Sequence, residues 1–412
     1  MGEERCSCAG VVSFVFAATK AMMRSILLSA MRTRERILLC ALVLFACRKE
    51  PAGAIRLGEI ASMTGTGAFF GLQTSRGAQL AVQEINAAGG IHGRLVQFIL
   101  LDDQSKPEEA ATAATRLISS EHVVAILGAD ASTRSLFVAP KAQAARVPMM
   151  TPTSTNPKVT QVGDYVFRAC FIDSFQGYAM ARFARQHLKL KRAAILRDVR
   201  NDYSVGLADS FIQSFTRLGG EIAAEASYSE GDVDFKAQLT RFKTVAPEGI
   251  FIPGYYGDVG LIARQVRELG FSQVALFGTD GWDSERLYEI GGEALEGSTF
   301  STHYSTDDPS PRVQEFVAKY QKAYAGQLPD TGVPQAYDAA GMLFDAMKRA
   351  KDLSGPSLRD ALAQTRNYPG VTGDITLDEK RNPIKPAIVL RLGKGGRREF
   401  VAKILPESAP GR

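Results

Sequence analysis

Short hydroxyl side chains cluster at two places where the sequence predicts the end of a strand. The run Thr151-Pro-Thr-Ser-Thr-Asn-Pro157 directly follows a short apolar strand at 147–150, and Ser132 and Thr133 follow a second apolar strand at 123–127. Hydroxyls donate hydrogen bonds and helix N-termini carry partial positive charge, so such a cluster can hold a carboxylate. The same residues also favour ordinary N-caps and turns, and the pattern alone leaves both interpretations open.

The first 47 residues have the pattern of a targeting segment. Arg32, Arg34 and Arg36 precede an apolar run at 37–45, which is too short to span a bilayer and is typical of a secretory signal. Cys47 follows a small residue, as in a bacterial lipoprotein cleavage site, and we predict that its thiol is acylated. Met31 is the predicted true start. The alternative is a single-pass anchor that stays in place.

The composition of the remaining chain excludes several classes of protein. Without residues 1–47 there are 43 basic and 41 acidic side chains, because six of the 49 basic and three of the 44 acidic residues leave, and the net charge is +2. This balance indicates neither nucleic acid nor an anionic membrane surface as a partner. Cys170 is then the one remaining cysteine, so no internal disulfide is expected. The histidines have no metal-ligand spacing, and no metal site is predicted.

Beyond the targeting segment, the chain reads as two similar halves of alternating strands and helices. About 360 residues exceed the usual size of one core, so two domains are expected. The short apolar strands and the helical apolar spacing are predicted at these positions: strands 55–60, 96–101, 123–127 and 147–150 with helices 76–86, 107–118 and 133–145, then strands 193–196, 221–227, 249–253 and 274–277 with helices 205–218, 235–245 and 259–269. Such alternation predicts an α/β fold of two doubly wound parallel-sheet lobes. Ligands of such sheets bind beyond the carboxyl ends of the strands, so the cleft between the lobes is the expected site.

Two enzyme patterns fail on inspection. The run Gly65-Thr-Gly67-Ala-Phe-Phe-Gly71 follows a strand like a dinucleotide fingerprint, but its last spacing is one residue too long and no acid lies about twenty residues beyond it. No Gly-x-Ser-x-Gly occurs, and no histidine has a partner for nucleophilic catalysis. The sequence therefore favours a binding protein that is not an enzyme and needs no cofactor.

Several segments, in order from residue 55 to about 400, resemble the leucine/isoleucine/valine-binding protein family. The resemblance rests on these segments: Gly58–Gly65, Gly77–Ile91, Asp102-Asp103, Thr151–Pro157, Arg168–Gly177, Gly254-Tyr-Tyr256 and Asp280-Gly281. It implies a type I periplasmic binding fold, with two lobes joined by three crossovers near Asp173, His303 and Asn382. The implied first lobe comprises 53–173 and 303–382, and the second lobe 174–302 and 383–406.

The resemblance also implies roles for particular residues. Ser132, Ser154 and Thr155, with Thr153 adjacent, match the positions that hold the α-carboxylate of the ligand. Tyr203 and Tyr255, or Tyr256 in place of Tyr255, match tyrosines of the second lobe that cover the ligand. Phe70 matches an aromatic position in the first loop. Asp280 matches the acid that pairs with the ligand ammonium, where leucine-type proteins have the longer Glu, and Asp173 matches a bracing acid at the hinge.

The function implied is that of an extracytoplasmic solute-binding protein. It is expected to be a monomer in the periplasm or cell envelope, lipid-anchored, that delivers an aliphatic or branched-chain amino acid to the permease of an ATP-binding-cassette (ABC) importer. One alternative is a ligand-sensing receptor module for amides. Another is a binder of small carboxylates without an amine, which would leave Asp280 without a cation.

Overall fold

The structure is a computed structural model that describes residues 53–406. The predicted signal segment and the acylation site at Cys47 lie outside the described residues. The first sheet has five parallel strands in the order β2-β1-β3-β4-β5. Their bounds are β1 (Ile55–Ala61), β2 (Val96–Asp102), β3 (Ala125–Gly128), β4 (Met149–Thr151) and β5 (Val166–Arg168). We call this sheet and the helices packed on it the first lobe.

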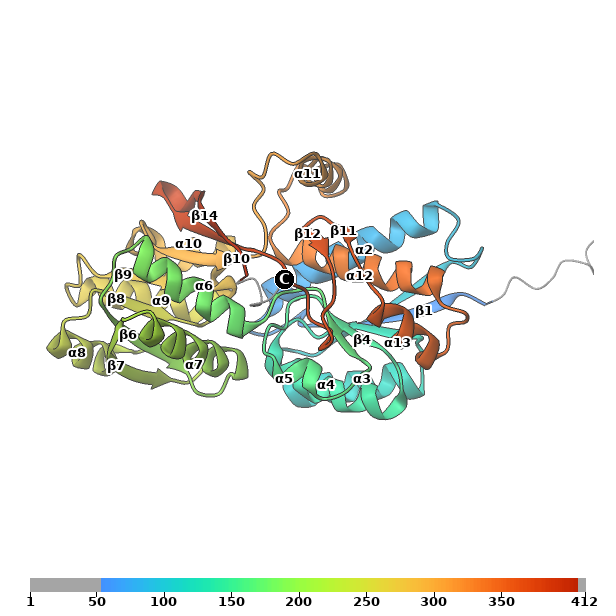
Figure 1. The fold of residues 1–412 in the computed structure, drawn as a ribbon, viewed down its shortest axis with the longest axis horizontal. Coiled ribbons are helices and arrows are strands. Elements are labelled where there is room, and N and C mark those ends of the chain that lie inside the picture. Colours follow the sequence, from blue (N-terminus) through green and yellow to red (C-terminus); the bar gives the residue numbers. More distant parts are fainter. Residues whose placement is uncertain (1–52, 407–412) are drawn as a thin grey trace, which may run out of the picture. The chain divides into compact units, whose positions relative to one another are not determined.

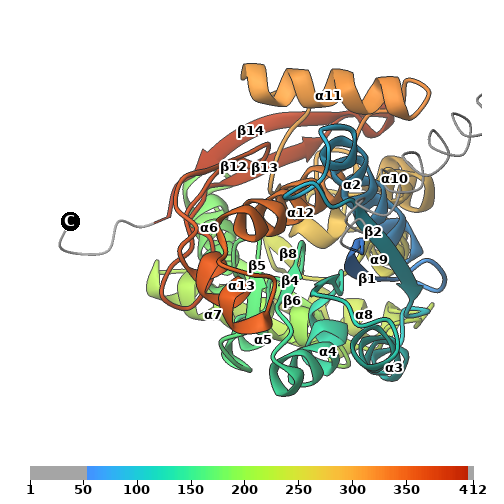
Figure 2. The ribbon, with the colours of Figure 1, turned by 90° about the vertical axis from the view of Figure 1, so that its right-hand side faces the viewer.

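Helices cover both faces of the first sheet. On one face of the sheet, α2, α12 and α13 pack their apolar sides against the strands. On the other face, α3 and α4 pack against the strands in the same way. Figure 2 shows α2 and α12 on one side of strands β1 and β4 and α3 and α4 on the other. The helices of this lobe are α2 (Ala68–Ala87), α3 (Pro107–Ser119), α4 (Ser132–Ala145), α5 (Lys158–Gln161), α11 (Pro311–Ala323), α12 (Gly332–Arg349) and α13 (Gly355–Ala363). A small hairpin, β11 (Tyr368–Gly370) and β12 (Gly373–Ile375), follows α13.

The second sheet has seven strands in the order β14-β13-β10-β9-β8-β6-β7. The strands are β6 (Arg192–Asp198), β7 (Glu221–Tyr228), β8 (Gly249–Ile252), β9 (Ala275–Gly278), β10 (Thr299–Thr302), β13 (Ala387–Leu392) and β14 (Arg398–Ile404). Helices α6 and α7 pack on one face, and α8 and α9 on the other. The helices are α6 (Asp173–Gln186), α7 (Asp202–Arg217), α8 (Lys236–Val245), α9 (Tyr256–Glu268) and α10 (Glu285–Gly291), with short 3₁₀ turns η1 (Asp280–Trp282), η2 (Gly292–Leu295) and η3 (Lys394–Gly396). We call this sheet with its helices the second lobe.

The chain passes between the two sheets three times. It leaves the first sheet after β5, returns after β10 to form α11 and α12, and enters the second sheet again at β13. In Figure 1 the red strand β14 therefore lies among elements of the second lobe, far in sequence from its green and yellow neighbours. The predicted α/β fold with two doubly wound lobes is confirmed. One feature differs: β13 and β14 are antiparallel, so the second sheet is mixed.

Helix α2 begins at Ala68, eight residues before the predicted start at Arg76. Its first turns contain Gly71, Thr74 and Ser75, which are weak helix formers, so local propensity did not reveal them. Tertiary packing decides the start, because a Cβ atom on Gly71 would lie 2.0 Å from the carbonyl oxygen of Ser62. This close approach seats the helix against the end of β1 and places Phe70 in its first turn.

Candidate ligand-binding site

The predicted site residues follow the carboxyl ends of parallel strands in both lobes. Ser132 begins α4 just after β3, and the run 151–157 follows β4. In the second lobe, Tyr203 lies in the first turn of α7 after β6, Tyr255 precedes α9 after β8, and Asp280 begins η1 after β9. Such strand ends are where open α/β sheets bind ligands.

Five of the eight predicted residues line one small cavity, which we call the inner chamber. The predicted residues on its wall are Phe70, Thr153, Tyr203, Tyr255 and Asp280. The other lining residues are Asp130, Ala131, Arg134, Gly281, Thr331, Gly332 and Gln335. The chamber thus has polar groups from both lobes around a single aromatic wall.

The carboxylate of Asp280 accepts hydrogen bonds from three elements. Its Oδ1 accepts from the hydroxyl of Tyr203 at 2.7 Å and from Nε2 of Gln176 at 2.8 Å. Its Oδ2 lies 3.0 Å from Nε2 of His303. The side chain of Asp280 still reaches the chamber, with 9% of the residue exposed.

His303 is a neutral donor at this site. Burial lowers its pKa to about 4, although the bond to Asp280 opposes the shift. The ring stacks on Phe171, with the two ring centres 3.7 Å apart. Since the ring is uncharged at pH 7, its Nε2–H donates to Asp280 without neutralising it. Within residues 53–406 no Lys or Arg forms an ion pair with Asp280, so a cation on a ligand would be its first full counter-charge.

Two stacked tyrosines, Tyr203 and Tyr255, line the chamber on the side of the second lobe. The rings of Tyr203 and Tyr255 are 5.1 Å apart and nearly parallel, at 7°. The Tyr203 hydroxyl contacts Thr279 at 2.8 Å and accepts from the backbone N–H of Gly281, which fixes the turn that carries Asp280. Tyr255 lines the chamber, whereas the hydroxyl of Tyr256 donates to the carbonyl of Thr66 at 3.0 Å. Tyr255 is therefore the tyrosine of this pair that faces the cavity.

In the predicted hydroxyl cluster, one residue lines the chamber and the others are buried behind it. Thr153 is on the wall, and its hydroxyl donates to the carbonyl of Asp130 at 2.6 Å. Ser154 turns inward, where its hydroxyl contacts Ser135 and donates to Ala129. Ser132 accepts a bond from the backbone N–H of Asn156 at 3.1 Å, and Thr155 is fully buried. The structure thus brings the cluster to the chamber, but Ser132, Ser154 and Thr155 lie behind the surface that Thr153 presents.

Arg134 is a basic residue of the site that the sequence did not reveal. It lies in α4 and lines the chamber, with its Nη2 3.2 Å from Asp130 and its Nε 3.4 Å from Asp103. These carboxylates raise its pKa against the opposing effect of burial. Burial and the nearby Asp130 in turn raise the pKa of Asp103 to about 6. The position of Arg134, just after the Ser132-Thr133 pair, was the one local signal for it.

A second cavity, which we call the outer chamber, adjoins the first. Its wall shares Phe70, Arg134 and Tyr255 with the inner chamber. The further lining residues are Thr66, Gly67, Glu230, Gly257 and Asp258. A ligand that passes these three shared side chains would therefore contact both chambers.

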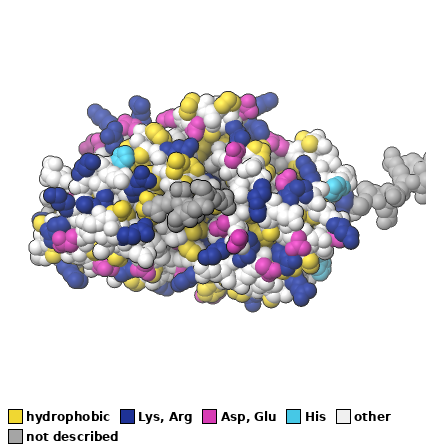
Figure 3. Space-filling view, in the orientation of Figure 1, with side chains coloured by type: hydrophobic (Ala, Val, Ile, Leu, Met, Phe, Trp, Pro, Cys, Tyr) yellow, Lys and Arg dark blue, Asp and Glu magenta, His cyan; other side chains and the backbone are white. Residues whose placement is uncertain are grey.

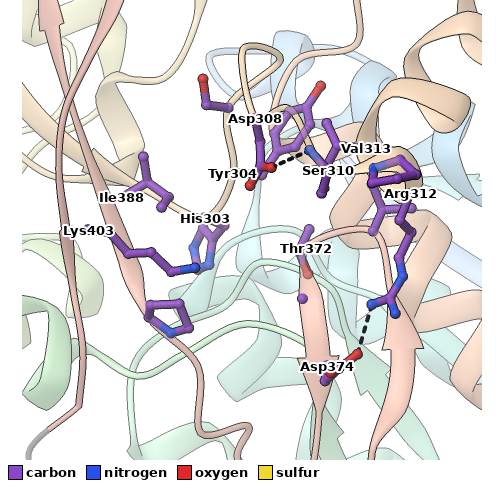
Figure 4. A pocket seen from close by; sticks show the side chains of 15 residues that line it. His303, Tyr304, Asp308, Ser310, Arg312, Val313, Thr372, Asp374, Ile388 and Lys403 are labelled. Carbon is purple, nitrogen blue, oxygen red and sulfur yellow. Dashed lines mark hydrogen bonds and ion pairs between the residues drawn. The ribbon is translucent and has the colours of Figure 1, made fainter.

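A larger cavity of about 700 Å³ lies away from these residues, where the chain passes between α11 and the strands β12 and β13. Figure 4 shows its labelled polar side chains, among them Arg312, which forms an ion pair with Asp374 at 2.8 Å. It contains none of the predicted site residues. His303 links it to the inner chamber, because it lines the larger cavity and bonds to Asp280.

Asp102, which belongs to a segment of the resemblance, and Trp282, the single tryptophan of the sequence, have structural roles. Asp102 accepts bonds from the backbone N–H groups of Met63 and Gln104 and so closes the turn after β2. Trp282 is fully buried and donates to the carbonyl of Ile252. In the part of the chain that the structure describes, no three His, Cys, Asp or Glu side chains are arranged to hold a metal ion. A search of the same residues finds no helix long and apolar enough to cross a membrane.

On the face drawn in Figure 3, basic and acidic side chains are interspersed. This mixture agrees with the small net charge expected for the chain without residues 1–47.

Comparison with known proteins identifies the family. A family model described as periplasmic binding protein matches residues 54–397. The Leu/Ile/Val-binding protein homolog 3 of Brucella melitensis is 31% identical over 300 residues, which cover 72% of this chain and 79% of the relative. The Leu/Ile/Val-binding protein BraC3 of Rhizobium johnstonii is 31% identical over 333 residues, covering 79% and 88%.

Solved structures agree with this assignment. The leucine-binding protein LivK of Thermotoga maritima has a TM-score of 0.82 at 41% identity, covering 86% of this chain and 99% of that one. The branched-chain amino acid protein LivJ of Streptococcus pneumoniae, solved with isoleucine, has a TM-score of 0.79 at 33% identity, covering 84% and 99%. A solute-binding protein of Rhodopseudomonas palustris in complex with benzoate has a TM-score of 0.77 at 25% identity, covering 87% and 98%. The chain belongs to the periplasmic binding protein family and is of the Leu/Ile/Val-binding type.

Proposed function

We propose that this protein is an extracytoplasmic solute-binding protein that delivers an amino acid, aliphatic or branched-chain, to an ABC importer. The observation that carries the proposal is the carboxylate of Asp280, whose three contacts are all with neutral groups. A buried carboxylate without a counter-ion is unfavourable, and the ammonium of an amino acid supplies the missing positive charge. The names of the relatives and of the two solved structures support the same ligand class.

In this proposal the ligand first binds to the first lobe through its α-carboxylate. The run after β4 and the start of α4 form the side of the chamber that the carboxylate faces, with Thr153 at the surface and Ser132, Ser154 and Thr155 behind it. Tyr203, Tyr255 and Asp280 then cover the ligand from the second lobe, while Phe70 packs on its side chain. Closure is driven by the higher affinity of the ligand for the closed arrangement, and the permease recognises that arrangement.

Hydrogen bonds that cross between the lobes support a closing motion. Thr66 donates to Glu230 at 2.5 Å and accepts from Tyr256 at 3.0 Å, and Thr133 accepts from the backbone N–H of Asp202 at 3.0 Å. We propose the lobe boundaries given by the resemblance, with 53–173 and 303–382 in the first lobe and 174–302 and 383–406 in the second. We further propose a monomer without catalytic activity, exported by the signal segment and anchored through an acyl chain on Cys47.

A second candidate ligand is a carboxylate without an amine, because the relative from Rhodopseudomonas palustris is in complex with benzoate. Such a ligand would leave Asp280 without a cation. A receptor module for amides is a third possibility, which would show binding without transport.

The test is a thermal-shift and calorimetric screen of the exported form. Leucine, isoleucine and valine are compared with benzoate, 4-methylpentanoate and the amino-acid amides. A ligand at a thousandfold excess over Kd should raise the free energy of unfolding by about 4 kcal/mol. Stabilisation by carboxylates or amides, with none by the amino acids, would refute the proposal.

A further inference from the structure

Two turns that form opposite walls of the inner chamber each adjoin a buried acid. In the second lobe, Asp283 directly follows η1, the turn that carries Asp280, and it is 2% exposed. In the first lobe, Asp330 directly precedes Thr331, which lines the chamber just before α12, and it is 7% exposed. Two carboxylates from different lobes therefore lie behind the same cavity.

These two acids oppose each other across the lobes. Burial raises the pKa of Asp283 to about 6, with the charge of Asp330 adding to the shift and Arg398 opposing it. An effect of one carboxylate on the pKa of the other means that the two are close enough to interact. Like charges in a buried place repel, so the lobes meet favourably here only if a cation lies between the acids.

Arg398 is that cation. It begins β14 in the second lobe, and its Nη1 lies 2.6 Å from Oδ1 of Asp330 and 3.3 Å from Oδ1 of Asp283. The pair with Asp283 stays within the second lobe, whereas the pair with Asp330 crosses to the first lobe. Arg398 does not line the inner chamber, so it joins the two walls from behind.

Hydrogen bonds connect this ion pair to the residues that line the chamber. The hydroxyls of Thr331 and Thr302 lie 3.2 Å apart, and Thr302 donates to Asp283. Thr331 donates to Oε1 of Gln335 at 3.4 Å, and Nε2 of Gln335 donates to the carbonyl of Pro152 at 3.3 Å. Pro152 belongs to the hydroxyl run after β4. The interlobe pair and the chamber wall are thus parts of one network.

We propose that Arg398 is a positioning residue for ligand binding, which holds the two walls of the inner chamber together by pairing with Asp330 across the lobes. Arg398 acts through its partners: it stabilises the closed arrangement, on which the affinity for the amino acid depends. The inference rests on the proposed function, because it takes the amino acid to bind between lobes that close. Loss of the interlobe pair should act mainly on the dissociation rate, since the lobes must separate before the ligand can leave.

The experiment measures the Kd of leucine by calorimetry and its dissociation rate by stopped-flow fluorescence of Trp282, the single tryptophan, which directly precedes Asp283. Asp330→Asn removes the charge that pairs across the lobes and keeps the pair of Arg398 with Asp283. We expect its Kd and its dissociation rate each to rise about tenfold or more, and its association rate to change less than about threefold. Asp283→Asn keeps the interlobe pair and removes a like charge, so it should raise the Kd by a smaller factor.

Two further variants test the role of the arginine itself. Arg398→Met leaves the two acids facing each other without a cation, so it should weaken leucine binding at least as much as Asp330→Asn does. Arg391→Met is the matched control, because the exposed Arg391 lies in the same sheet, on β13, and pairs with Glu399 at 2.7 Å. It should change neither the Kd nor the dissociation rate. A damaged fold would instead lower the binding-competent fraction seen by calorimetry and leave the dissociation rate unchanged.

The outcomes distinguish this inference from the proposed function. If leucine binds to the parent but Asp283→Asn weakens binding as much as Asp330→Asn, the role of Arg398 is refuted and the proposed function stands. An unchanged dissociation rate in Asp330→Asn has the same meaning. If neither leucine, isoleucine nor valine binds to the parent, both are refuted.

Discussion

His303 and Asp280 lie 3.0 Å apart, Nε2 to Oδ2, and they join the second crossover of the chain to the ligand chamber. His303 follows β10, at the point where the chain returns to the first lobe. The ring is stacked on Phe171, which precedes the first crossover into α6. The acid that we propose for the ligand ammonium is therefore held by segments at which the chain crosses between the lobes.

The first prediction concerns the charge of Asp280. Asp280→Asn should weaken binding of leucine by about 2–5 kcal/mol, because the ammonium loses its charged partner. This loss corresponds to an increase in Kd of tens to thousands of times, on the order given by 1.4 kcal/mol per factor of ten. The variant should bind 4-methylpentanoate, which lacks the amine, no worse than the parent does. Calorimetry on both proteins with both ligands gives the coupling free energy between Asp280 and the ligand amine. An equal loss of affinity for the two ligands would show that Asp280 only supports its loop.

The second prediction separates the roles of Tyr203 and Tyr256. Tyr203→Phe removes the donor to Asp280 and the acceptor for Gly281, so the acid loses its position and binding should weaken about tenfold, near 1.4 kcal/mol. Tyr256→Phe removes only the interlobe bond to Thr66, so it should weaken binding less than Tyr203→Phe does. If titrations show a larger loss of affinity for Tyr256→Phe than for Tyr203→Phe, the role proposed for Tyr203 is wrong.

The third prediction distinguishes, within the hydroxyl run, a residue that contacts the ligand from one that stabilises the fold. Ser154→Ala removes an inward-facing hydroxyl that contacts Ser135 and donates to Ala129, so it should lower the free energy of unfolding by about 1–3 kcal/mol. Thr153→Ala, at the chamber surface, should affect leucine binding more than stability. Urea unfolding and calorimetry on both variants test the division, and the reverse pattern would contradict it.

The fourth prediction is a pH dependence that arises from Asp173. Burial raises the pKa of this carboxyl to about 8, although Thr155 and Arg168 oppose the shift. The native state keeps this proton up to about pH 8, whereas the unfolded chain loses it above about pH 4. The unfolded state thus binds fewer protons in that window, and this residue makes stability fall as the pH rises.

Asp173→Asn should therefore be more stable than the parent at pH 8, by an amount on the order of a few kcal/mol, and similar to it at pH 4. Chemical unfolding at several pH values measures the difference. A gap that does not grow with pH would show that Asp173 is ionised in the native state.

The fifth prediction concerns Cys47, which lies before the described residues. Cys47→Ser should release the protein from the membrane and abolish labelling with a fatty-acid probe, because no thiol remains to be acylated. Binding of leucine should not change, since none of the residues that line the inner chamber lies in the segment 1–47. Membrane retention of the variant, together with an unlabelled parent, would rule out the anchor.

The sequence by itself determined the fold and the loops that build the site. Alternation of strand and helix patterns is a local property, and it predicted two parallel sheets and placed Ser132 and Thr153 at strand ends. The resemblance also implied ligand-contact roles for Phe70, Tyr203 and Tyr255, and the structure places these three residues at one chamber.

Only the tertiary structure decided which side chains face the ligand and what holds them. Gln176 and His303 are 104 and 23 residues from Asp280 in the chain, and no local pattern joins them. Arg134 enters the wall because α4 turns it toward Asp103 at the end of another strand. Likewise β13 and β14 are antiparallel because the third crossover brings the chain back to the edge at β10. Periodicity fixes elements one at a time, whereas these contacts depend on how distant elements pack.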